Sequence, residues 1–254
     1  MKAVDWKLSE LAYRIRESSR DAGYIEIFPP SYVKSDKVKG FRFIFRNNVY
    51  VFEPDITTRL INRIKENARI YYISQQIDEF LNESIEAGLE IIGGDENETN
   101  VEIIEMAIKI LDALGLKDYN IDISLAGIFN SYRDQGNTEL INAVRNRNYQ
   151  QIEDMEIKNR EKLLEIMETR TRKSGIKKLD DIIERINDPR VIIDLGTVRQ
   201  PEYYDGLIFE IYSNQGFLGG GGNYKTGNMN GCGFSLDLRA LSKLDQNIYK
   251  RVKK

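Results

Sequence analysis

The chain has 254 residues, of which 41% are hydrophobic and 10% aromatic, enough to bury a sizeable core. Its 37 basic and 40 acidic residues give a net charge of -3, so no general attraction to nucleic acid or anionic membranes is expected. The absence of histidine excludes serine–histidine triads, HExxH zinc sites and any histidine general base, and the single Cys232 excludes an internal disulfide and a multi-cysteine zinc site.

The sequence shows no targeting or membrane signal. No stretch approaches the roughly 18 consecutive apolar residues of a membrane span. The charged, amphipathic N-terminus lacks the apolar run of a signal peptide. We therefore predict a cytoplasmic protein with neither a nucleic-acid nor a membrane partner, and we expect no metal and no cofactor.

The N-terminal part of the chain alternates helical and strand patterns. It predicts a helix over 6–22, a strand over 24–28, a hairpin over 41–53, a helix over 57–67 and a strand over 69–74. The first helix has apolar residues at helical spacing and ends at Gly23. The hairpin turns near Asn47 and Asn48, residues that tolerate turn conformations.

The rest of the chain predicts further strands, a long helix and a helical insertion. The strands are expected over 88–94, 120–128, 191–196, 207–213 and 233–238, and the helix over 101–115. The charged segment 139–186 is mostly helical in pattern, either an inserted subdomain or a connecting bundle. Together these elements predict an α+β fold with a mainly antiparallel sheet flanked by helices, and the lack of regular βαβ alternation disfavours Rossmann and barrel folds.

Two motifs suggest a ligand but have simpler explanations. The glycine-rich GFLGGGGNYKTGN, 216–228, lacks the GK[ST] ending of a P-loop, and we interpret it as a tight glycine turn that lets two strands and a ligand approach. VRQPEYYDG, 198–206, places an arginine beside two tyrosines, which taken alone favours half-buried packing.

Two acidic segments complement that arginine. FEPDITT, 52–58, and EAGLE, 86–90, each place carboxylates at a strand end. Isolated surface carboxylates are usually solvated. Combined with an arginine and tyrosines, however, they are the groups that hold a zwitterionic amino acid, with carboxylates for its ammonium and guanidinium for its carboxylate.

The order of these segments resembles the histidyl-tRNA synthetases and their regulatory paralogues over nearly the whole chain. AGYIEIFPPSY resembles the first class II motif, FEPDITT the RPDxT segment, LEIIGGDENETN with its helix the acidic loop, DLGTVRQPEYYDG the RGLDYYTG segment, and GGGGNYKTGN with GCGFSLDLRAL the GGRYD segment and third motif. This implies one class II synthetase-like domain over 1–254, with a mostly helical insertion at about 139–186.

The resemblance also implies residues that bind histidine. It places Asp55, Thr57 and Glu86 near the amino group and Arg199 near the carboxylate. Around the imidazole it places Glu90, Tyr203, Tyr204 and Tyr224. Arg239 matches the arginine of the third motif, and no catalytic residue is assigned.

Departures from the family pattern indicate a protein that does not activate amino acids. Asp78 occupies the position of the phosphate-binding arginine of the second motif, and an acidic residue cannot hold a nucleotide phosphate. The loop before EAGLE is also shorter than in a synthetase, and we expect no anticodon-binding domain after Lys254.

This pattern implies a non-catalytic regulator. Among the paralogues it corresponds to the subunit that activates the short catalytic subunit of ATP phosphoribosyltransferase, acts as a homodimer within a hetero-oligomer, and responds to L-histidine as effector. Two alternatives remain: a truncated synthetase-like ligase that forms an aminoacyl adenylate, and an orphan interaction module.

Overall fold

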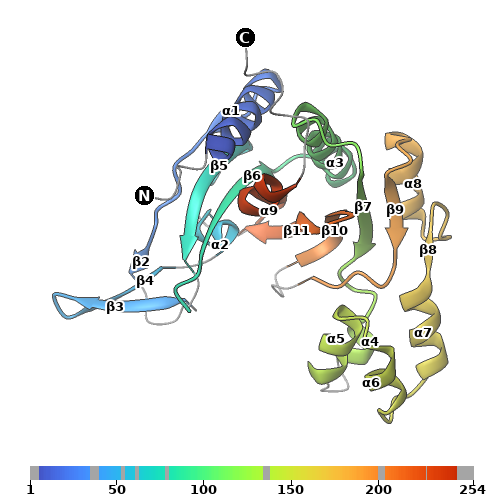
Figure 1. The fold of residues 1–254 in the computed structure, drawn as a ribbon. Helices are drawn as coiled ribbons and strands as arrows, with labels where there is room; N and C mark the ends of the chain where they lie inside the picture. Colours follow the sequence, from blue (N-terminus) through green and yellow to red (C-terminus); the bar gives the residue numbers. More distant parts are fainter. Residues whose placement is uncertain are drawn as a thin grey trace. The chain divides into compact units, whose positions relative to one another are not determined.

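The structure is a computed structural model that describes residues 6–34, 40–52, 55–60, 63–77, 80–133, 138–199, 204–226 and 228–244. The chain divides into two units. Figure 1 labels the helices and strands of both. The first unit contains 1–94, 103–117 and 226–254, and the second contains 95–102 and 118–225.

The first unit contains four strands in the order β1-β5-β6-β12. They are β1 (Ile25–Glu26), β5 (Ala68–Ile77), β6 (Glu83–Ile92) and β12 (Met229–Asp237). Only the β1–β5 pair is parallel among them. Helix α1 (Trp6–Asp21) packs on α9 (Leu238–Lys243), and it buries Leu11 and Ile15, one helical turn apart on the same face.

A small sheet in the order β2-β4-β3 belongs to the same unit. Its strands are β2 (Val33–Lys34), β3 (Phe41–Phe45) and β4 (Asn48–Phe52), and the short helix α2 (Ile56–Leu60) follows. Arg46 and Asn47 both have positive φ, 48° and 59°, as a two-residue hairpin turn requires. The predicted hairpin is confirmed, with its turn one residue earlier than expected.

The second unit contains five strands in the order β11-β10-β7-β9-β8. They are β7 (Tyr119–Leu125), β8 (Arg170–Thr171), β9 (Val191–Asp194), β10 (Tyr204–Ser213) and β11 (Gly216–Thr226). The β7–β9 pair is parallel, and the other described pairs are antiparallel. The mainly antiparallel α+β prediction is therefore confirmed.

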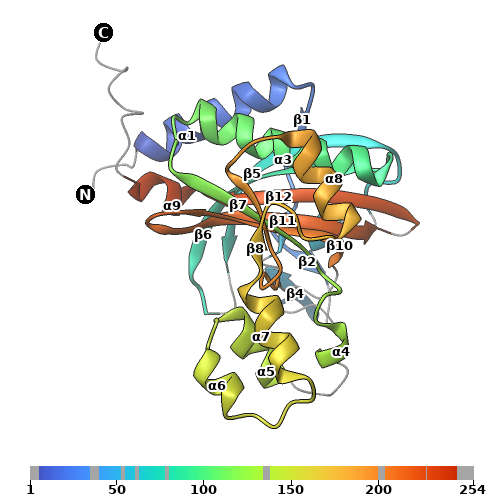
Figure 2. The same ribbon diagram turned by 90° about the vertical axis from the view of Figure 1, so that its right-hand side faces the viewer.

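The predicted helical segment follows β7. Helices α4 (Asn130–Arg133), α5 (Thr138–Arg145), α6 (Tyr149–Glu153) and α7 (Arg160–Glu168) gather around their own buried core (Figure 2). That core includes Leu140, Val144, Ile152 and Leu163, each at most 1% exposed. Helix α8 (Lys177–Ile186) instead packs against β9.

Helix α3 (Glu96–Ala113) begins in the second unit and ends in the first. It starts before the expected 101–115 because Asp95 accepts hydrogen bonds from the amides of Asn97 and Glu98 and so caps it. No helix in the described segments combines the length and apolar character needed to cross a membrane.

Two predicted elements are wrong. The glycine-rich segment is not a turn, because Gly216–Thr226 form strand β11, which pairs with β10. The helix expected over 57–67 is only Ile56–Leu60, and the chain enters β5 at Ala68.

Candidate functional site

The predicted ligands that lie in the first unit are Asp55 and Thr57, at the start of α2, and Glu86 and Glu90 of β6. The hydroxyl of Thr57 donates to Oε1 of Glu90 at 2.9 Å, and the backbone amide of Thr57 donates to Oδ1 of Asp55 at 3.2 Å. Glu90 is 1% exposed. The hydrogen bond from Thr57 therefore gives a buried carboxylate a fixed orientation.

Glycines make room for these side chains. A Cβ at Gly233 of β12, which lies opposite Glu90, would collide with the Glu90 carboxylate. A Cβ at Gly88 would collide with the ring of Tyr72, which crosses β6 there. Since alternate residues of a strand share a face, Glu86 and Glu90 project from the same side of β6.

Electrostatics favour a positive charge beside Glu86. Burial raises the pKa of Glu86, and the nearby charges of Asp55 and Asp237 raise it further, against hydrogen bonds with Ser235 and Gln76 that lower it. A cation placed among these carboxylates would relieve their repulsion. An ammonium group is one such cation.

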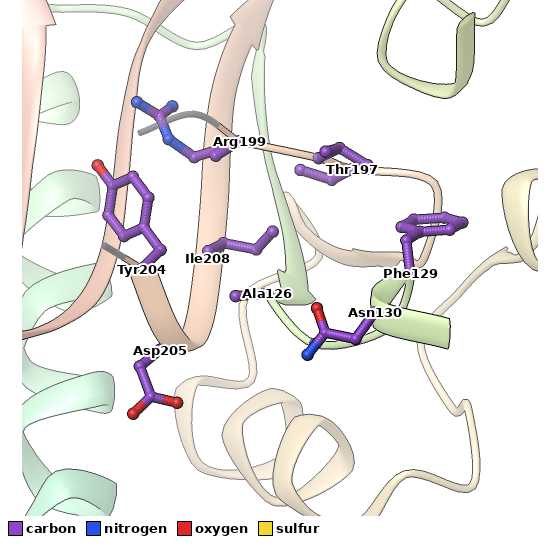
Figure 3. Close-up of a pocket in the computed structure, with 10 residues that line it drawn as sticks. Ala126, Phe129, Asn130, Thr197, Arg199, Tyr204, Asp205 and Ile208 are labelled. Carbon is purple, nitrogen blue, oxygen red and sulfur yellow. The ribbon is translucent and has the colours of Figure 1, made fainter. Parts of the chain in front are cut away.

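The other predicted ligands that the structure describes lie in the second unit, and Figure 3 shows two of them, Arg199 and Tyr204. Tyr204 of β10 and Tyr224 of β11 are opposite each other in the strand pair. The guanidinium of Arg199 lies 5.5 Å from the centre of the Tyr204 ring. Arg199 and Tyr204 line a cavity of about 180 Å³, with Ala126, Asn130, Thr197 and Asp205 also in its wall.

Arg199 keeps unused hydrogen-bonding capacity. Its Nη1 lies 3.4 Å from the carbonyl oxygen of Phe209 and 3.7 Å from Oε1 of Glu210. Its Nε is buried and has no hydrogen-bond partner within the described chain. A buried donor without a partner is costly, so a ligand carboxylate that accepted from Arg199 would remove this cost.

Sequence reasoning missed the residues that support this wall. The side chain of Asn223 accepts from the amide of Leu207 at 2.7 Å and donates to Asn100 at 2.6 Å. These bonds join β11 to β10 and to the start of α3. The one sequence signal for the supporting role of Asn223 is its position within the GGGGNY segment.

Three predicted positions have a different outcome. Tyr203 and Asp78 lie outside the described residues. Arg239 is exposed at the start of α9, and its Nη2 lies 3.3 Å from Oε2 of Glu83. An exposed ion pair of this kind contributes little stability.

Two solved structures share the fold. One, described as an ATP phosphoribosyltransferase regulatory subunit/histidyl-tRNA synthetase from Bacillus halodurans C, matches 95% of this chain and 80% of its own, with a TM-score of 0.81 and 19% identity. The other, an ATP phosphoribosyl transferase (HisG:HisZ) complex from Thermotoga maritima, matches 93% of this chain and 98% of its own, with a TM-score of 0.72 and 20% identity.

Sequence comparison gives the family. A protein named ATP phosphoribosyltransferase regulatory subunit, from Caldanaerobacter subterraneus subsp. tengcongensis, is 29% identical over 77% of this chain. This chain spans 65% of that relative's length. The model of the histidyl-tRNA synthetase family matches residues 55–241. Because this match covers most of the chain, which also has the family's α+β fold, the protein belongs to the histidyl-tRNA synthetase family.

Proposed function

We propose that this protein is a regulatory subunit of ATP phosphoribosyltransferase that activates a short catalytic subunit and transmits feedback inhibition by L-histidine. The observation that carries the proposal is the similarity to relatives named as that regulatory subunit, within a family named for histidyl-tRNA synthetases. The role places the protein in histidine biosynthesis and, we propose, in the cytoplasm.

The site residues support an amino acid as effector. Asp55, Thr57 and Glu86 would bind the ammonium group and Arg199 the carboxylate. Glu90, Tyr203, Tyr204 and Tyr224 would contact the imidazole, where a carboxylate accepts from a ring N–H. The oriented carboxylate of Glu90 and the unpartnered Nε of Arg199 are the features that favour this assignment.

A different residue, Asp78, argues against amino-acid activation. Where the family pattern has a phosphate-binding arginine this chain has Asp78, whose charge would repel ATP. We therefore propose a regulator without catalytic activity of its own. We also propose a homodimer within a hetero-oligomer, and the Thermotoga maritima structure named as a HisG:HisZ complex supports such an assembly.

The deciding experiment mixes the purified protein with the short catalytic subunit of the same organism and follows ATP phosphoribosyltransferase turnover across a histidine titration. Activation on mixing that histidine reverses would support the proposal. Unchanged turnover at every mixing ratio would refute it. Histidine-dependent exchange of pyrophosphate into ATP by this protein alone would instead indicate the ligase alternative, for which the retained Arg239 is the remaining argument.

A further inference from the structure

A second cavity in the second unit has no role in the function proposed above. It measures about 470 Å³ and is lined almost entirely by polar side chains. Asn120 and Asp122 of β7 form its floor, facing Tyr212 and Glu210 of the neighbouring β10. Most ligand pockets are lined mainly by apolar side chains, so this composition suits a small, highly polar ligand.

Arginines from the insertion and from β8 surround the floor. Nη2 of Arg147 lies 2.6 Å from Oδ1 of Asp194, and Nη2 of Arg170 lies 2.9 Å from Oδ1 of Asp122. A Cβ at Gly196 would lie 2.8 Å from Nη1 of Arg147, so a glycine is needed where this guanidinium crosses the chain. Both contacts hold the cavity walls in place.

The charges are arranged in two layers. The carboxylates at the floor are buried, since Asp122 is 5% exposed and Asp194 2%. At the rim, the side chain of Arg170 is 49% exposed, and Arg145 is exposed with no ion-pair partner among the described residues. Three carboxylates, those of Asp122, Asp194 and Glu210, line the cavity. Burial, which is the largest cause, raises the pKa of Asp122 to about 6 despite the nearby charge of Arg170.

A purely structural role, as two ion pairs that anchor the cavity walls, would account for the presence of Arg147 and Arg170. It would not account for the other polar residues of the lining. Two structural ion pairs do not require an open cavity, a third carboxylate (Glu210) in its lining or an additional arginine at its rim. A ligand with opposite charges at its two ends would satisfy all three features, because its cationic end would meet the carboxylates and its anionic end would meet Arg145 and Arg170.

We propose that this cavity is a second ligand site, for a small metabolite with a protonated or hydrogen-bond-donating nitrogen at one end and a carboxylate or phosphate at the other. Free amino acids and amino-bearing nucleotides both have this chemistry. The nitrogen binds at Asp122 and Glu210, and the anionic group binds at Arg145 and Arg170.

Isothermal titration calorimetry of the whole protein tests the site with three probes: L-histidine, AMP and inorganic phosphate. Arg145→Gln removes the rim charge at an exposed position, and Asp122→Asn changes the floor without altering its volume. Arg63→Gln, an exposed arginine outside this cavity, is the matched control. We expect at least one of histidine and AMP to bind, roughly ten- to a hundredfold more weakly to both cavity variants and unchanged to the control.

The three probes distinguish an amino-acid ligand from a nucleotide ligand. The variants distinguish the second cavity from the proposed histidine site. Histidine binding that Arg145→Gln weakens indicates an amino-acid site, and AMP binding with the same response indicates a nucleotide site. Glu90→Gln tests the histidine site proposed above and should leave the second cavity unaffected, so either proposal can fail alone. Binding of neither histidine nor AMP, binding of phosphate alone, or binding that neither cavity variant weakens would overturn the second site.

Discussion

Burial of the Asp122 carboxyl makes the stability of the protein depend on pH. Its pKa is about 6 in the folded chain, against roughly 3.9 in an unfolded one. Between these values the folded state binds more protons than the unfolded state, so the free energy of unfolding falls as pH rises through this window. Above about pH 6 the whole penalty of the ionised, buried carboxylate is present.

We therefore predict that Asp122→Asn changes the pH dependence of stability. Relative to the variant, the parent protein should lose about 2–3 kcal/mol as pH rises from about 4 to 7, since each pKa unit corresponds to about 1.4 kcal/mol. Urea unfolding followed by circular dichroism at several pH values measures this, with the exposed Asp118→Asn as control. Parallel curves for parent and Asp122→Asn would contradict the prediction.

Gly233 provides a second test at the scale of one residue. Gly233→Ala would place a methyl group against the Glu90 carboxylate and break its hydrogen bond with Thr57. We expect a loss of about 1–3 kcal/mol in stability from the overpacking and at least a tenfold loss of histidine affinity. Thermal unfolding and calorimetry measure the two effects. Histidine affinity equal to that of the parent would show that Glu90 does not need its present orientation.

Part of the candidate site could be predicted from residue types alone. The combination of carboxylates, an arginine and tyrosines indicated a zwitterion, and the structure places Thr57 on Glu90 and Arg199 over Tyr204. The cavity at Asp122 could not be predicted, because its residues come from separated segments that only strand pairing and the insertion bring together.

At the scale of elements, strand β11 shows why the glycine pattern was misleading. Glycine usually weakens a strand, but β11 pairs with β10 along Gly219 to Gly222. A Cβ at Gly220 would collide with the Arg199 guanidinium and the Phe209 carbonyl, and one at Gly222 with the Leu207 carbonyl. The glycines are needed because other groups approach closely, which a sequence pattern does not distinguish from a turn.

The side-chain hydrogen bonds of Asn223 are expected to stabilise strand β11 against β10 and α3. Asn223→Ala removes its bonds with the Leu207 amide and with Asn100, in a buried setting. We expect a loss of about 2–4 kcal/mol, since two buried polar groups each lose a partner. Chemical denaturation measures it, with the exposed turn residue Asn214→Ala as control. A loss no larger than that of the control would show that strand pairing alone holds β11.

At the scale of the whole molecule, the α+β class followed from the periodicity of the helices and strands, and the helical segment after β7 followed from its charged, helical pattern. The division into two units did not, because α3 belongs to both and β12 returns to the first unit after the insertion. Contacts between segments so distant in the chain depend on tertiary packing, which local patterns do not record.

The proposed coupling between histidine and the catalytic subunit is tested in the assembled enzyme with Glu90→Gln. Glutamine can still accept the hydrogen bond from Thr57 but removes the charge that a histidine ring N–H would meet. We expect the histidine concentration for half-inhibition to rise roughly ten- to a hundredfold, as the loss of one charge-assisted contact implies. Coupling between two binding sites is reciprocal. In the parent assembly, the substrates of the catalytic subunit should therefore weaken histidine binding by the same factor as histidine weakens substrate binding. Glu105→Gln, exposed on α3, should match the parent. An unchanged histidine response in Glu90→Gln would remove Glu90 from the effector site.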